Sequence, residues 1–266
     1  MTRKLSPSAL STFLKSPKAF YWRYRANLEP IGQSVVTFDH DKLAGQIWSA
    51  AVDRFYNGVP EAQNALQTMN EWEAGTDGWV PEKAKQKLTG ALGAWVSNYY
   101  QQFSPDDGCR APNQSELWAE NDRFRGRLDG LSAERVVHEV KSTSRSPNLT
   151  DQLWKVQNSL QVRLYCVLAE ANGHCVEFAF KDPPHAIFRG PVVSVSSEQR
   201  RAWELELNTL ADYINSLGDD PNNYACNPDG CCLVTKGMTS MCAYQSLCDM
   251  GLTEETKIAY KDREYK

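Results

Sequence analysis

Two carboxylates and a lysine lie close together in one segment of this 266-residue chain. Asp129 ends the tetrapeptide Gly-Arg-Leu-Asp, and Glu139 and Lys141 follow within twelve residues. Neighbouring carboxylates repel each other unless a divalent cation supplies positive charge. Oxygen ligands suit Mg²⁺ or Mn²⁺, which lower the pKa of a bound water and neutralise charge on a phosphate. Lys141 would orient that water or stabilise the developing charge, so the predicted chemistry is phosphodiester hydrolysis.

A β-hairpin must position these residues. Residues 124–131 and 135–141 are rich in aliphatic and β-branched residues, and 132–134 form a short polar connection. Side chains alternate between the faces of a strand, so Glu139 and Lys141 point the same way. With the turn near residue 133, Asp129 would lie opposite Val137 and diagonal to Glu139, within reach of a shared cation. An isolated Glu-x-Lys is more often a surface ion pair, so the neighbouring elements have to support the metal-site interpretation.

A helix predicted over residues 151–172 supplies the third part. Its leucines and valines recur at helical spacing, and Gln161 and Tyr165 stand four residues apart on one face. On their own, these two residues are more often ordinary helix residues than part of a site.

In this order, the motifs resemble those of the PD-(D/E)XK nuclease superfamily, and more narrowly its RecB-like exonuclease branch, which includes CRISPR-associated nucleases and many phage proteins. Gly126-x-x-Asp129, Glu139-x-Lys141 and Gln161-x-x-x-Tyr165 are similar to the three core motifs of that branch. Residues 5–20 resemble its opening helix, and residues 45–52 its first active-site helix. The resemblance covers most of the chain.

The resemblance implies a role for each matching residue. The implied metal ligands for Mg²⁺ or Mn²⁺ are Asp129, Glu139 and the backbone of Val140; the catalytic lysine is Lys141; the accessory pair is Gln161 and Tyr165. Ser49 departs from the pattern, because the branch usually has a histidine metal ligand at this position. Asp53, one turn further along the same predicted helix, or Glu116 or Glu120 on the strand before the hairpin, could compensate.

Five of the eight cysteines crowd into the end of the chain. They are the candidate cluster ligands Cys226, Cys231, Cys232, Cys242 and Cys248. The last two, with Cys231 or Cys232, resemble the closing cysteines of iron–sulfur members of the branch, but Ser16 stands where those members place their first cysteine. Cys226 would then be the fourth thiolate. Four thiolates suit a [4Fe–4S] cluster or Zn²⁺, the spacings match no common zinc pattern, and a metal-free tail is a third alternative.

The other cysteines and the histidines suggest no site. Cys109, Cys166 and Cys175 are scattered, and the four histidines form no ligand spacing. Cys166 falls in the predicted 151–172 helix and is interpreted as small core filler. His138 faces away from Glu139 by strand alternation, which favours a structural role. The apparent lack of a secretory leader predicts a reducing compartment.

The opening segment is basic and aromatic, although the whole chain has a net charge of −4. No acidic residue precedes Glu29. Cations that bind phosphates thus alternate with rings that stack on unpaired bases, or the rings form the core of a helical cap. The nucleic-acid-binding candidates are Lys15, Lys18, Tyr21, Trp22, Arg23 and Arg25.

The order of elements predicts an α/β fold, with a restriction-endonuclease-like mixed sheet core flanked by helices. Helices are expected over residues 41–56, 61–73, 82–103, 151–172 and 197–217, and strands within 116–141, 175–181 and 186–195. The predicted regions are a helical N-terminal region (1–110) with the first active-site helix, a nuclease core (111–220) and a cysteine-rich tail (221–266). The lack of a long apolar run excludes a transmembrane span.

Together these features predict a metal-dependent DNA nuclease. We expect a sequence-nonspecific exonuclease on single-stranded DNA or DNA ends, in recombination, repair or replication, in the cytoplasm of a bacterium or an infected host cell. The expected partner is DNA, with no membrane and with any protein partner unidentified. The alternative is a catalytically weak nucleic-acid clamp or assembly subunit with a cysteine-bound metal or cluster, which the serine at position 49 favours.

Overall fold

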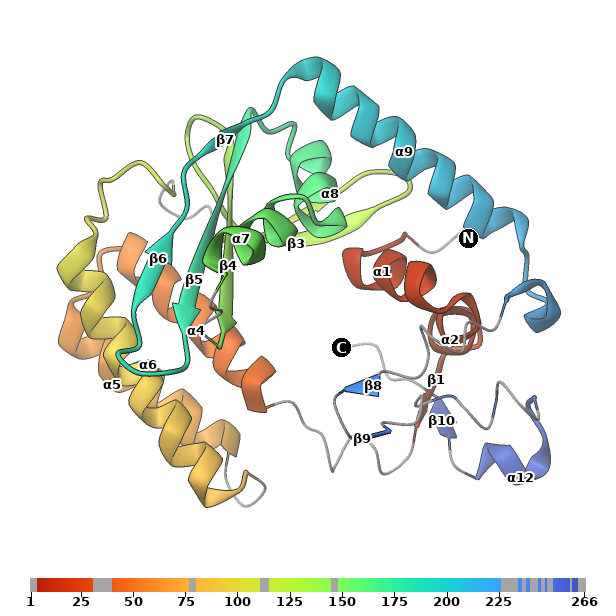
Figure 1. The fold of residues 1–266 in the computed structure, drawn as a ribbon, viewed down its shortest axis with the longest axis horizontal. Helices are drawn as coiled ribbons and strands as arrows, with labels where there is room; N and C mark the ends of the chain where they lie inside the picture. Colours follow the sequence, from red (N-terminus) through yellow and green to blue (C-terminus); the bar gives the residue numbers. More distant parts are fainter. Residues whose placement is uncertain are drawn as a thin grey trace. The chain divides into compact units, whose positions relative to one another are not determined.

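The computed structural model describes residues 4–30, 40–76, 80–110, 115–144, 148–225, 234–235, 238–239, 244, 247, 251–258 and 260–262 (Figure 1). The chain forms two compact units. The sheet unit comprises Asp39–Asn121 and Arg125–Glu204, and the terminal unit comprises Met1–Phe38, Asp122–Phe124 and Leu205–Lys266. The division into regions 1–110, 111–220 and 221–266 stays a prediction.

Three long helices begin the sheet unit. They are α4 (His40–Tyr56), α5 (Glu61–Thr76) and α6 (Glu82–Gln102), as the sequence predicted within a few residues. Helix α4 ends at a turn in which Gly58 has a φ of 75°, a conformation that favours glycine. Pro60 and Pro81 then precede the next two helices, where a missing N–H does no harm.

The sheet has six strands and mixed direction. The strands are β2 (Ser115–Glu120), β3 (Arg125–Leu131), β4 (Val136–Thr143), β5 (Gly173–Phe180), β6 (Ile187–Arg189) and β7 (Val193–Ser194). Their order is β2-β3-β4-β5-β6, with β7 also paired to β5. Strands β4 and β5 are parallel and the other pairs are antiparallel. The predicted mixed α/β fold is therefore confirmed.

The connection from β4 to β5 contains two helices where the sequence predicted one. Helix α7 (Leu149–Gln157) and helix α8 (Leu160–Leu168) are separated at Asn158 and Ser159. The Ser159 hydroxyl accepts a hydrogen bond from the N–H of Val162 at 3.3 Å and so caps the start of α8. The prediction of a single helix over 151–172 is wrong. The apolar residues keep a helical spacing across the break, so their pattern gave no sign of it.

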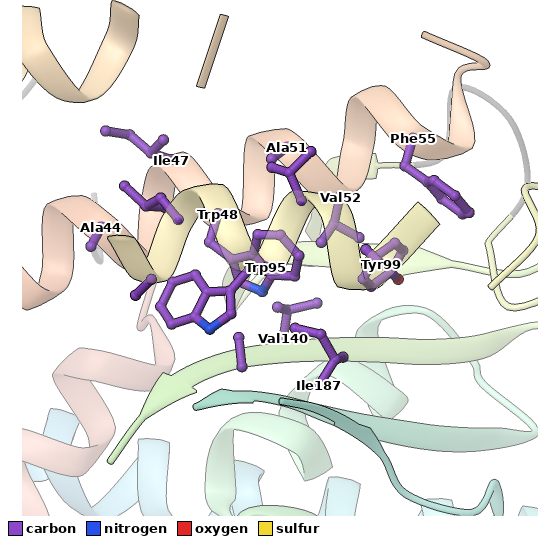
Figure 2. Packing of buried hydrophobic residues seen from close by; sticks show 14 of the residues in the cluster. Ala44, Ile47, Trp48, Ala51, Val52, Phe55, Trp95, Tyr99, Val140 and Ile187 are labelled. Atoms are coloured by element: carbon purple, nitrogen blue, oxygen red, sulfur yellow. The ribbon is translucent and has the colours of Figure 1, made fainter. Parts of the chain in front are cut away.

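Helices cover both faces of the sheet. Figure 2 shows one side of the core, where Trp48 of α4 and Trp95 of α6 pack above β4, with ring centroids 5.5 Å apart. Trp95 Nε1 donates a hydrogen bond to the backbone oxygen of Phe180 at 2.9 Å, so the ring is fixed to the sheet as well as buried. On the other face, α8 packs Val162 and Cys166 against β3 and β4. Cys166 is fully buried, which confirms it as core filler.

The register of the β3–β4 hairpin differs from the prediction. Leu131 pairs with Val137, whereas the sequence placed Asp129 opposite Val137. The paired positions end at Gly130 and His138, and beyond them the N–H of Val140 donates to the side chain of Asp129 at 2.9 Å. The predicted pairing of Asp129 with Val137 is therefore wrong, and the side chain of Asp129 lies beside the backbone of Val140.

The shift originates in the turn. The loop comprises residues 133–135 instead of 132–134, because the N–H of Ser132 donates to the oxygen of Val136 at 3.0 Å. Arg135 has a φ of 62° and closes the loop in the left-handed conformation. A three-residue loop of this kind, with its last residue left-handed, is a common hairpin connection.

The terminal unit begins with short helical segments. Helix α1 (Pro7–Lys15), helix α2 (Pro17–Phe20), the π-helical turn η1 (Tyr21–Arg25) and strand β1 (Leu28–Pro30) follow one another. Ser6 and Ser16 cap α1 and α2, and Pro7 and Pro17 stand in their first turns, where a missing N–H does no harm. Strand β1 pairs with β10 (Tyr260–Asp262). The remaining elements are η2 (Pro221–Asn223), β8 (Val234–Thr235), β9 (Met238–Thr239) and α12 (Glu254–Lys257).

Helix α9 (Ser197–Ser216) belongs to both units, because the boundary falls after Glu204. None of the helices in the described part of the chain has the length and apolar character needed to cross a membrane.

Candidate active site

Strands β3 and β4 bring the two predicted carboxylates and the lysine together. Glu139 is fully buried, and its Oε1 forms an ion pair with Nζ of Lys141, two residues further along the same face. Asp129 comes from β3, and its Oδ2 accepts a hydrogen bond from the N–H of Val140 at 2.9 Å. The side chain of Asp129 is therefore held against β4 by the N–H of residue 140. Any residue except proline could supply this N–H.

This arrangement has excess negative charge in a buried place. Burial, and then the neighbouring charge of Asp129, raise the pKa of Glu139 to about 7. Burial alone would lower the pKa of Lys141, but the carboxylates of Glu139 and Asp129 outweigh it and raise that pKa. Within the described residues, Glu139 Oε2 has no hydrogen-bond partner. A buried carboxylate oxygen in this state favours a cationic ligand.

Gln161 and Tyr165 extend the group from helix α8. Lys141 Nζ donates to Oε1 of Gln161 at 3.1 Å, and Gln161 Nε2 donates to the hydroxyl of Tyr165 at 3.2 Å. The Tyr165 ring crosses β3 at Gly126, where a Cβ atom would lie 2.5 Å from Tyr165 Cε1. The glycine of the Gly-x-x-Asp motif therefore leaves room for the Tyr165 ring, which a larger residue would displace. All five predicted catalytic side chains come together.

A pocket of about 850 Å³ opens beside these strands. Asp129, Val140 and Lys141 line it on the sheet side, and α4 and α5 line the other side. Glu139 does not line the pocket and reaches it through its ion pair with Lys141. Ser49 also lines the pocket, with its hydroxyl buried and without a hydrogen-bond partner among the described residues.

The other substitutes for the missing histidine are less well placed. Asp53 is partly buried on α4 but does not line the pocket. Glu120 is exposed at the end of β2, and the side chain of Glu116 lies outside the described residues. Ser49 lines the pocket, whereas the described side chains of Asp53 and Glu120 do not.

Two basic residues in the pocket lining were not predicted. Lys42 lies in the first turn of α4, and Arg127 lies two residues before Asp129 on the same face of β3. The alternation of the strand could have identified Arg127. Nothing in the local sequence indicates Lys42, because helix α4 reaches the site only through tertiary packing.

The donor set fits a hard divalent cation. Asp129 and Glu139 offer carboxylate oxygens, Glu139 Oε2 has no hydrogen-bond partner among the described residues, and burial and Asp129 raise the pKa of Glu139. The sequence matches the family model of the PD-(D/E)XK nuclease superfamily over residues 4–249. The chain belongs to this superfamily. This match confirms the predicted superfamily. Members of the PD-(D/E)XK superfamily usually use divalent metals such as Mg²⁺ or Mn²⁺, which agrees with the donor set.

Comparison with solved structures gives distant similarities. A phage-related exonuclease from Haemophilus somnus 129PT has 12% identity and a TM-score of 0.40, with 82% of this chain and 96% of that chain covered. A candidate exonuclease from Eubacterium rectale has 11% identity and a TM-score of 0.47, with 85% of each chain covered. No curated protein matches the sequence. The family assignment rests on the sequence match, and the RecB-like branch stays a prediction.

The nucleic-acid-binding candidates of the terminal unit differ in exposure. Trp22 is 3% exposed and packs with Tyr244 and Tyr260, so it is a core residue, one of the two alternatives left open by the sequence. Lys15 and Arg23 are exposed. The partly buried side chains each donate to a backbone or side-chain oxygen of the same unit: Lys18 to Pro221, Tyr21 to Asp219 and Arg25 to Asn215.

The predicted cluster ligands are outside the described residues. This applies to Cys226, Cys231, Cys232, Cys242 and Cys248. Ser16, at the position of the first cysteine of iron–sulfur members, is 3% exposed and accepts a hydrogen bond from the N–H of Ala19 at 3.2 Å. Its side chain therefore has a structural use as the cap of α2.

Proposed function

We propose that this nuclease is a Mg²⁺- or Mn²⁺-dependent deoxyribonuclease whose active site is formed by Asp129, Glu139 and Lys141. The observation that carries the proposal is the buried Glu139 carboxylate, which has a raised pKa beside Asp129 and an oxygen without a hydrogen-bond partner in the described part of the chain. When bound there, a divalent ion lowers the pKa of a water and neutralises charge on a phosphodiester.

The side chains have separate roles in this proposal. Asp129, held by the N–H of Val140, and Glu139 bind the cation, and the backbone oxygen of Val140 is the third protein ligand. Lys141 keeps its proton, because its pKa is raised, and presents a positive charge to the phosphate. Gln161 holds the ammonium of Lys141, and Tyr165 holds the amide of Gln161, so these two position the lysine.

We further propose that the substrate is DNA with free ends, degraded without sequence preference. The cations Lys42 and Arg127 in the pocket lining support binding of a phosphate backbone. The exposed Lys15 and Arg23 support a second contact with DNA by the terminal unit. In this role the enzyme acts in recombination, repair or replication of a bacterial or phage genome in the bacterial cytoplasm.

Cleavage of end-labelled DNA tests the function. Purified protein is incubated with single- and double-stranded oligonucleotides and with a closed circular single strand, in Mg²⁺, Mn²⁺ or EDTA. We expect loss of label from linear DNA only, dependence on the metal, and a decrease of about 100- to 1000-fold in Lys141→Met. The matched control is Lys155→Met, because Lys155 pairs with Asp151 on the exposed surface of α7. Equal cleavage by Lys141→Met and the wild type would show that the activity does not come from this site.

A nucleic-acid clamp or assembly subunit is the second candidate function. Ser49 favours it, because this side chain lines the pocket where the branch usually has a histidine ligand. Stable DNA binding by the wild type without cleavage in either metal would support this candidate. In both functions, the tail cysteines are proposed to hold a [4Fe–4S] cluster, with zinc as the alternative. Anaerobic purification followed by absorption spectroscopy and elemental analysis distinguishes iron, zinc and neither.

A further inference from the structure

Two cysteines and a histidine meet on the face of β4 opposite Glu139. Ligand atoms of Cys109, His138 and Cys175 all lie within 4.8 Å of one another. His138 and Cys175 are paired in register on β4 and β5, so their side chains share a face, and Cys109 comes from the segment after α6. The interpretation of Cys109 and Cys175 as scattered, and of the histidines as part of no site, is wrong at this point, because only the fold joins the three segments.

Two arginine side chains lie beside this group. Arg110 Nε donates to Nδ1 of His138 at 2.8 Å, and Arg110 is only 3% exposed. Its two Nη atoms have no hydrogen-bond partner in the described part of the chain. On the other side, Arg189 Nε donates to Oε2 of Glu177 at 3.0 Å, and this oxygen lies 3.5 Å from Nε2 of His138. Positive charge around a thiol favours its ionised form.

The two sulfur atoms have different surroundings. The hydrogen bond from the thiol of Cys175 outweighs the opposing effect of burial and lowers the pKa of Cys109 to about 4, and the charge of Arg189 acts in the same direction. Cys109 is partly exposed, whereas Cys175 is 1% exposed and its Sγ donates to the oxygen of Gly190 at 3.2 Å. A partly exposed thiolate beside a protonated, buried partner thiol is the arrangement of an oxidisable cysteine with its resolving cysteine.

A metal ion fits the same atoms less well. Nδ1 of His138 accepts a hydrogen bond from Arg110, so the proton of a neutral ring is on Nε2, and neither nitrogen is left for a metal. Arg110 and Arg189 also supply positive charge near the sulfurs, where Zn²⁺ would bring more. The guanidinium groups thus already supply the positive charge that a metal ion supplies in a thiolate metal site.

We propose that Cys109 and Cys175 form a peroxide-sensitive dithiol, which oxidation converts to a disulfide between the segment after α6 and strand β5. The Cys109 thiolate attacks one oxygen of the peroxide, the O–O bond breaks, and hydroxide leaves, which gives a sulfenic acid on Cys109. The Cys175 sulfur then attacks the Cys109 sulfur, the S–S bond forms, and the S–O bond breaks. Water leaves with the thiol proton of Cys175. The two cysteines lose two electrons in total, and the peroxide gains them.

Peptide mapping after oxidation tests the proposal without any need for nuclease activity. The full-length wild type is treated with hydrogen peroxide, its remaining thiols are alkylated in denaturant, and a digest is analysed by mass spectrometry. We expect one linked peptide that joins Cys109 to Cys175 and loss of alkylation at both. In Cys175→Ser we expect no linked peptide and a Cys109 sulfenic acid that dimedone traps. The matched control is Cys166→Ala, whose thiol is buried in the core on the other face and whose loss leaves the linkage unchanged.

Three results would overturn the dithiol. The first is full alkylation of Cys109 and Cys175 in the peroxide-treated wild type, which needs no variant to fold. The second is a link from Cys109 to a tail cysteine instead of Cys175. The third is zinc in the purified wild type that protects both thiols and is lost in Cys109→Ser, since the group would then be a metal site.

Discussion

The pKa values of two buried glutamates on neighbouring strands are shifted in opposite directions. Glu139 on β4 and Glu177 on β5 are both fully buried, but their side chains face opposite sides of the sheet. Burial and Asp129 raise the pKa of Glu139 to about 7. Burial also acts to raise the pKa of Glu177, but the contacts of this carboxylate with His138 and Arg189 outweigh burial and lower that pKa.

The difference lies in the partners. Glu177 Oε2 accepts hydrogen bonds from Arg189 at 3.0 Å and from the hydroxyl of Tyr99 at 3.1 Å, so the protein itself neutralises this carboxylate. Glu139 forms an ion pair with Lys141, but Asp129 and Gln161 also interact with this lysine. A buried carboxylate that the fold neutralises is structural, whereas one that the fold leaves short of positive charge marks a place for a cationic ligand.

The largest predicted effect separates the two glutamates by activity. Glu139→Gln should reduce metal-dependent DNA cleavage by about 1000-fold, equivalent to about 4 kcal/mol, because a cation ligand is lost. Its free energy of unfolding should stay close to that of the wild type, because repulsion with Asp129 is lost together with the contact to Lys141. Cleavage kinetics and urea unfolding of the same preparation measure both quantities. Wild-type cleavage by Glu139→Gln would remove the distinction.

The second prediction concerns the Glu177 side of the sheet. Arg189→Met should lower the free energy of unfolding by about 3 kcal/mol, because it leaves a buried carboxylate without its cation. Urea unfolding followed by circular dichroism measures the change. The matched control is Arg123→Met, whose ion pair with Asp212 is largely exposed and should contribute less than about 1 kcal/mol. Equal effects of the two substitutions would contradict a structural role for the buried pair.

The third prediction tests the fit of Tyr165 over β3. Gly126→Ala should destabilise the protein by about 2 kcal/mol and reduce cleavage, since a Cβ would lie 2.5 Å from Tyr165 Cε1 and must displace the ring that supports Gln161. Gly90→Ala on α6 is the matched control, because nothing lies within 4 Å of its Cβ. The control should gain roughly 0.5 to 1 kcal/mol from helix propensity. A neutral Gly126→Ala would show that the ring does not need this position.

The smallest predicted effect is the response to pH and metal. The folded-state pKa of Glu139 is raised from 4.5 to about 7, so the metal-free protein should lose stability as pH rises through this window. Mn²⁺ at ten times its Kd should restore about 1.4 kcal/mol at pH 8 and almost nothing at pH 5, where Glu139 is protonated. Thermal unfolding across this range measures the effect. Equal stabilisation by Mn²⁺ at both pH values would contradict binding at Glu139.

The sequence predicted the elements and the faces better than the pairings. Strand alternation places Glu139 and Lys141 on one side of β4 and His138 on the other, whichever residues of β3 they pair with. The register itself depended on whether Arg135 adopts a left-handed conformation, which arginine rarely does. The break between α7 and α8 was missed because it depends on a cap at Ser159.

The sequence pattern did not predict the contacts between distant segments. Lys42 reaches the pocket because α4 packs on the sheet, and Cys109 meets Cys175 because the segment after α6 returns to β5. No local pattern encodes such contacts. The three core motifs were recognisable, in contrast, because each lies within one strand or one helix turn, where residue spacing fixes which side chains share a face.

Mn²⁺ binding followed by electron paramagnetic resonance tests the central claim most directly. The claim is that Glu139 and Asp129 hold the divalent ion that the nuclease uses. At pH 8, the wild type and the exposed-surface control Glu134→Gln should bind Mn²⁺ with the same affinity, and Glu139→Gln should lose this binding. Equal Mn²⁺ binding by Glu139→Gln and the wild type would contradict the account.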